Sequence, residues 1–80
     1  MMKVEEIEVD EAVRNFITDR GGDYRVTTTC SGAIILPTSI SPPKETDITI
    51  KIGQSTLYVS VYQARWIKRI DKRMLYYVRF

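Results

Sequence analysis

Residues 48–59 read Ile-Thr-Ile-Lys-Ile-Gly-Gln-Ser-Thr-Leu-Tyr-Val, and this stretch decides the fold class. Apolar residues alternate with polar ones on both sides of Gly53-Gln54, with the period of two that is typical of half-buried strands. Gly53-Gln54 fits a two-residue hairpin turn with glycine first. The stretch therefore predicts two antiparallel strands joined by a tight turn.

The turn also sets the register of the two strands. It places Ile50 opposite Leu57 on one face and Thr49 opposite Tyr58 on the other. One face of the hairpin is thus apolar and needs a covering layer.

An amphipathic helix is predicted upstream of the hairpin, over residues 11–20. Asp10 is a good N-cap, and Glu11 favours the positive end of the helix dipole. Gly21-Gly22 supplies a left-handed stop. Apolar residues recur at helical spacing, namely Val9, Ala12, Val13, Phe16 and Ile17.

Three more strands are predicted from alternation or from short apolar runs. They cover residues 3–9, 24–30 and 33–36. Residues 37–47 form the one long loop, and its Pro42-Pro43 pair favours a stiff, extended path. We expect this loop to be a fixed crossover and not a moving lid.

The segment from residue 60 to residue 73 fits two structures. Ser60 and Gln63 have the spacing of a capping box, which favours a helix over residues 61–73. The alternative continues the preceding strand and turns at Asp71-Lys72. The helix would gather an apolar stripe of Tyr62, Trp66, Ile67, Ile70 and Met74. A last strand is then predicted from the alternation of Met74, Tyr76, Val78 and Phe80.

The expected order is β-α-β-β-β-β-α-β. Short links and hairpins of this kind are typical of an α+β fold, with an antiparallel-rich sheet and two helices packed on one face. We expect residues 1–80 to form a single domain, since 80 residues suffice for one modest core.

The composition argues against most enzyme chemistries. The chain has no histidine and one cysteine, so it has no Ser–His or Cys–His pair and no structural zinc site. Cys30 shares the phase of buried strand residues and is expected to be an inert thiol. These absences favour a non-catalytic role.

The expected location is the cytoplasm. The N-terminus is acidic where a signal peptide is basic and then apolar, and no apolar run approaches the roughly 20 residues that span a bilayer. We therefore expect no membrane partner. The single asparagine and two glutamines are typical of thermophilic proteins, which avoid thermolabile amides.

Charge is sorted along the chain. Five of the ten acidic residues fall in the first eleven positions, and six of the twelve basic residues fall in the last sixteen. On a helix, the bases of residues 61–73 would share one surface that could bind an anionic partner such as RNA or DNA. The alternative is an ordinary solvated helix face. The candidate anion-binding residues are Arg65, Lys68, Arg69, Lys72 and Arg73.

The acidic end offers a different ligand class. Glu6, Glu8 and Asp10 share one strand face and could give oxygen ligands to calcium or magnesium. No other cofactor is predicted. The alternatives are charges that protect an edge strand, and pairing of Glu6 or Glu8 with the C-terminal bases.

A third possibility is a protein–protein module or homo-oligomer. The predicted last strand is rich in aromatic residues, namely Tyr76, Tyr77 and Phe80. A domain with a small core often gains stability by association.

Overall fold

The hairpin over residues 48–59 forms with the expected register in the computed structural model, which describes residues 7–29 and 32–78. Strands β4 (Ile48–Ile52) and β5 (Ser55–Val59) are antiparallel, with Ile50 opposite Leu57. Gly53 opens the turn with φ of 60°, a conformation that residues with a Cβ rarely adopt. The prediction from the alternating pattern is confirmed.

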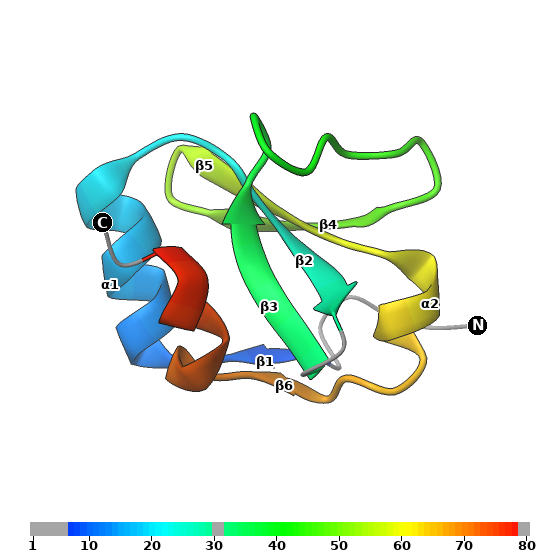
Figure 1. Cartoon of the computed structure of the whole chain (residues 1–80). Coiled ribbons are helices and arrows are strands. Elements are labelled where there is room, and N and C mark those ends of the chain that lie inside the picture. The colour runs from blue at the N-terminus through cyan, green and yellow to red at the C-terminus, as the bar shows by residue number, and fades with distance from the viewer. Residues whose placement is uncertain (1–6, 30–31, 79–80) are drawn as a thin grey trace.

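A four-stranded mixed sheet is built around this hairpin (Figure 1). Strands β2 (Tyr24–Thr29) and β3 (Gly32–Pro37) form a second antiparallel pair. The strand order is β3-β2-β5-β4, because β2 pairs with β5 in parallel. The apolar faces of both hairpins thus join into one surface.

Helix α1 (Glu11–Arg20) forms as predicted and packs with this surface. Val13 and Ile17 are fully buried. Gly21, with φ of 73°, ends the helix, and its N–H donates to the carbonyl of Ile17 at 2.8 Å. Asp10 occupies the N-cap position, but its side chain accepts no capping hydrogen bond from the described residues.

Helices and a mixed sheet share one core, so the α+β class is confirmed. The largest fully buried side chains are Ile17, Ile35, Leu57, Ile70, Val13, Val26 and Val59. No helix within residues 7–29 and 32–78 has both the length and the apolar composition that crossing a membrane requires.

The C-terminal third differs from the prediction in its elements and in their bounds. Helix α2 spans Val61–Ala64, so the prediction of a helix over residues 61–73 is wrong. It is followed by a two-residue strand, β6 (Arg69–Ile70), and by a 3₁₀ helix, η2 (Lys72–Val78). The last strand predicted from residue 74 onward is therefore also wrong over residues 74–78, and residues 79–80 lie outside the described part of the chain.

A long-range pairing explains why the helix stops. Strand β1 (Glu8–Val9) runs parallel to β6, with backbone hydrogen bonds from Glu8 N to Lys68 O at 3.0 Å and from Asp10 N to Ile70 O at 2.9 Å. This pairing buries Ile70 completely. A helix through residue 73 would leave β1 unpaired, so tertiary contact overrides local helical periodicity here.

Half of the predicted capping box is present. Ser60 accepts a hydrogen bond from Tyr62 N at 3.3 Å, as an N-cap should. Gln63 does not return the contact, because its amide donates to Thr28 Oγ1 on β2 instead. Ala64 is 1% exposed, so this one helical turn is fastened to the sheet.

Some predictions fall on residues that the structure does not describe. They concern residues 3–6 of the first strand, the Cys30 thiol, and Phe80.

A buried ion pair ties the long loop to the sheet. Arg25, on β2, points away from the core face and meets Asp47, which directly precedes β4. Two hydrogen bonds join them, from Nε to Oδ2 at 2.6 Å and from an Nη to Oδ1 at 3.1 Å. Arg25 also donates to Ser41 Oγ at 3.3 Å, inside the loop. These bonds fix the proline-rich crossover at two points.

The pair also shifts the pKa values of both groups. Burial opposes ionisation of Asp47, but hydrogen bonds from Arg25 and from the Lys44 backbone N–H, with the nearby positive charges, lower the pKa of Asp47 overall. The hydrogen bond to Asp47 raises the pKa of Arg25. Both groups are therefore charged at neutral pH.

We expect Asp47→Asn to lower the free energy of unfolding by about 3 kcal/mol, because it leaves the Arg25 charge buried without a counterion. Urea unfolding measures the effect. Glu45→Gln, at an exposed position in the same loop, is the matched control and should change stability by less than about 0.5 kcal/mol. Equal effects of the two variants would contradict this role.

The stability advantage of the wild type over Asp47→Asn should depend on pH. Because folding lowers the pKa of Asp47, the advantage is complete above the unfolded value of about 3.9 and is lost as pH falls through the folded value. Unfolding curves from neutral to acidic pH test this. An advantage that stays constant down to the most acidic pH would contradict it.

Candidate functional site

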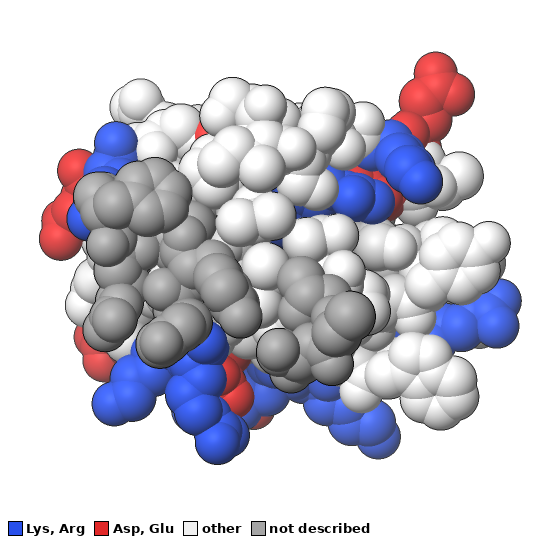
Figure 2. Space-filling view, in the orientation of Figure 1, with Lys and Arg blue, Asp and Glu red and all other residues white. Residues whose placement is uncertain are grey.

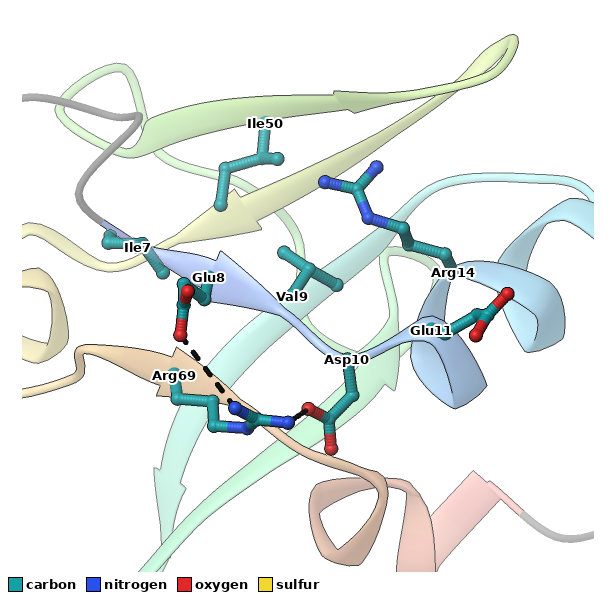
Figure 3. Close-up of a pocket in the computed structure, with 8 residues that line it drawn as sticks. All are labelled: Ile7, Glu8, Val9, Asp10, Glu11, Arg14, Ile50 and Arg69. Carbon is teal, nitrogen blue, oxygen red and sulfur yellow. Dashed lines mark ion pairs between the residues drawn. The ribbon is translucent and has the colours of Figure 1, made fainter.

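The hollow drawn in Figure 3 lies where the N-terminal strand meets α1, β4 and β6. It is an open groove of about 520 Å³ with an apolar floor and a charged rim. Arg14 extends from α1 toward Ile50, whereas Glu11 points away from it (Figure 3). The lining residues are Ile7, Glu8, Val9, Asp10, Glu11, Arg14, Ile50 and Arg69.

One rim of this groove is closed by the Arg69 clasp, which we define as Arg69 with Glu8 and Asp10. The Arg69 guanidinium lies 3.7 Å from Glu8 and forms a closer ion pair with Asp10 (Figure 3). The Asp10 side chain is 17% exposed, against 75% for Glu8, so Asp10 is the better shielded partner. Oδ1 of Asp10 is buried and accepts no hydrogen bond of regular geometry, so the Arg69 charge is what compensates it.

The clasp bears on the predicted metal ligands. Glu8 and Asp10 do converge, but on a guanidinium, and Glu6 lies outside the described residues. Within the described ranges, no three cysteine, aspartate or glutamate side chains form a group that could hold a metal ion. Calcium or magnesium binding at Glu6, Glu8 and Asp10 stays a prediction. The expected pairing of Glu8 with a C-terminal base is confirmed.

The five predicted anion-binding residues do not share one helix face. They are spread over the end of α2, β6 and the start of η2. Arg69 is held in the clasp, and Arg73 lies 3.5 Å from Asp71. Arg65, Lys68 and Lys72 are exposed and form no ion pair with a described residue. Anion binding by these residues remains a prediction.

Two aromatic side chains near the exposed basic residues Arg65 and Lys68 are themselves exposed to solvent. Tyr62 is 76% exposed and Trp66 is 80% exposed, although the helical pattern placed both on the predicted apolar stripe. We call Tyr62, Arg65, Trp66 and Lys68 the α2–β6 surface. A tryptophan that packs on little of its own protein is uncommon, since burying this side chain is strongly favourable.

A further hydrogen-bonded turn follows α2, in which the N–H groups of Trp66 and Ile67 both donate to Gln63 O. Arg65 has φ of −71° and ψ of −28°, and Ile67 N donates to Gln63 O at 2.8 Å. Residues three and four apart on a helical turn are neighbours. Tyr62 therefore has Arg65 and Trp66 beside it.

The sequence around the α2–β6 surface has few acidic residues, and the nearest one is Asp71, three residues after Lys68. No aspartate or glutamate occurs from residue 48 to residue 70, whereas four bases do. In Figure 2, basic side chains lie among uncharged ones at the end of the molecule formed by α2, and no acidic side chain of the described residues is visible over that helix. The surface thus carries basic side chains, without an ion-pair partner among the described residues, next to exposed aromatic rings.

No family model matches the chain, and no curated protein or solved structure shows significant similarity to it.

Sequence patterns missed two features of the structure. The exposure of Tyr62 and Trp66 was missed because their spacing fits a buried stripe equally well. The Arg25–Asp47 pair joins residues 22 apart, and its one local signal is an arginine inside a strand of otherwise apolar and threonine residues. The predicted homo-oligomer stays untested, since the side chains of Tyr76, Tyr77 and Phe80 lie outside the described part.

We expect the clasp to stabilise the fold through Asp10 more than through Glu8. Double-mutant cycles with Arg69→Gln should give a coupling of about 1 kcal/mol for Asp10→Asn, because that carboxylate is shielded from solvent. The coupling for Glu8→Gln should be below about 0.5 kcal/mol, as for other exposed pairs. Equal couplings would contradict the assigned roles.

Proposed function

We propose that the protein is a non-catalytic module that binds nucleic acid through the α2–β6 surface. The observation that carries the proposal is the 80% exposure of Trp66 next to Arg65 and Lys68, in a stretch without acidic residues. Protein surfaces that bind nucleic acid combine exposed aromatic rings with basic side chains that have no acidic partner.

The charges supply the general attraction. Arg65 and Lys68 have no acidic partner among the described residues, so their charges are available to phosphates. Each phosphate that they neutralise releases condensed counterions, which favours binding most at low salt. The net charge of +2 is small, so we expect weak binding that depends on this local cluster.

The Arg69 clasp narrows the set of basic residues that can bind phosphate. Arg69 is occupied by Glu8 and Asp10, so it contributes less to phosphate binding than its sequence position predicts. Next to the exposed rings, the basic residues without an ion-pair partner among the described residues are therefore Arg65 and Lys68.

Labelled mixed-sequence DNA and RNA should bind at low salt and lose affinity as salt rises. Arg65→Ala and Lys68→Ala should each lower the slope of log affinity against log salt by about 0.7, because each removes one phosphate contact. Fluorescence anisotropy measures both quantities.

The matched control is Lys51→Ala, which removes an exposed base at the turn end of the β4–β5 hairpin, at the other end of β5 from α2. Its slope should equal that of the wild type. No binding at low salt, or equal losses for all three variants, would contradict the proposal. A dimer that Trp66→Ala abolishes, together with no nucleic-acid binding, would assign the surface to a protein partner.

A further inference from the structure

We infer that unpaired bases stack on Tyr62 and Trp66, so that the preferred ligand is a single strand and not a duplex. This inference rests on the proposed function and names its ligand class. It depends on the aromatic rings of the surface, whereas the general attraction depends on its charges.

The first argument is the placement of the rings. The helical turn that runs from α2 to Ile67 sets Tyr62 and Trp66 four residues apart, with Cβ atoms about 5–6 Å from each other. Both side chains are more than three-quarters exposed. Neighbouring nucleotides of one strand can therefore reach both rings.

The second argument is that the platform is held in place. Ala64 is buried at 1% exposure between the two aromatic positions, and Gln63 donates to Thr28 on β2. Ser60 caps the turn from the other side. A fixed backbone lowers the conformational entropy that ordering the rings on binding would cost.

The third argument is the position of the charges. Arg65 lies three residues after Tyr62 on the same turn, so the two side chains are neighbours, and it directly precedes Trp66 in the chain. Lys68 follows where the chain leaves the turn. Nucleotides whose bases stack on the rings would therefore have their phosphates near Arg65 and Lys68.

A duplex fits this surface less well. Its base faces are covered by stacked neighbours, so exposed rings gain nothing from it without unstacking. Helix α2 has four residues, which gives it little length to lie along a major groove and read base edges.

Trp66 is the one tryptophan of the chain, so its intrinsic fluorescence reports on stacking directly. We would titrate the full chain with single-stranded DNA, single-stranded RNA and the corresponding duplexes of equal length at low salt. Single strands should quench Trp66 and bind at least about five-fold more tightly than duplexes. The DNA and RNA arms distinguish the two sources of unpaired bases.

Variants separate stacking from charge by anisotropy of labelled strands. Trp66→Ala and Tyr62→Ala should each weaken single-strand binding by about five-fold or more, while leaving duplex binding nearly unchanged. Trp66→Phe and Tyr62→Phe should retain most of the affinity, because they keep a ring. Circular dichroism checks folding, which we expect to persist because both side chains are exposed.

Equal affinities for single strands and duplexes, with Trp66→Ala weakening neither, would overturn the inference and leave the proposed function standing. Absence of binding to every nucleic acid at low salt would overturn both. An alanine variant that fails to fold would be replaced by the wild-type quenching experiment, which decides the question without a substitution.

Discussion

The backbone pairing of β1 with β6 determines the shape of the C-terminal third of the chain. Two hydrogen bonds, from Glu8 to Lys68 and from Asp10 to Ile70, draw residues 68–70 away from the helical path that follows Ser60. The helix ends after one turn, Ile70 enters the core, and Tyr62 and Trp66 remain outside. The exposed aromatic surface is thus a direct consequence of a contact between distant parts of the chain.

The same pairing explains what becomes of the acidic residues near the N-terminus and the basic residues near the C-terminus. It brings the acidic end of the chain against the basic end, where Glu8 and Asp10 neutralise Arg69 in the clasp. Arg65 and Lys68, a few residues earlier, have no such partner among the described residues. The basic cluster of the sequence is therefore divided, because Arg69 and Arg73 lie in ion pairs whereas Arg65, Lys68 and Lys72 have no ion-pair partner among the described residues.

The elements that the sequence predicts well are those whose signals are local. The β4–β5 hairpin depends on Gly53-Gln54 and its flanking alternation, and α1 depends on an apolar stripe that ends at Gly21. The region after Ser60 fails because its local cap and stripe favour a long helix, whereas pairing with a strand some 60 residues away favours a short one. A local sequence pattern does not show which of these two tendencies prevails.

The candidate site likewise has features that the sequence predicts and features that depend on the fold. The sequence includes Arg65 and Lys68 among five candidate anion-binding residues, which needs no knowledge of the fold. The capture of Arg69 by Glu8 and Asp10 requires the β1–β6 register, and the exposure of Trp66 requires knowing where the helix ends. Sequence analysis therefore identifies the charges of the surface but not its aromatic rings.

The central claim is that the α2–β6 surface binds nucleic acid, and an amide and indole NMR titration tests it most directly. With a single-stranded oligonucleotide at low salt, we expect the largest shifts at the Trp66 indole N–H and at the amides of residues 61–68, with little change at Arg14 and Ile50 in the groove. Shifts confined to the groove, or none at all, would contradict the account.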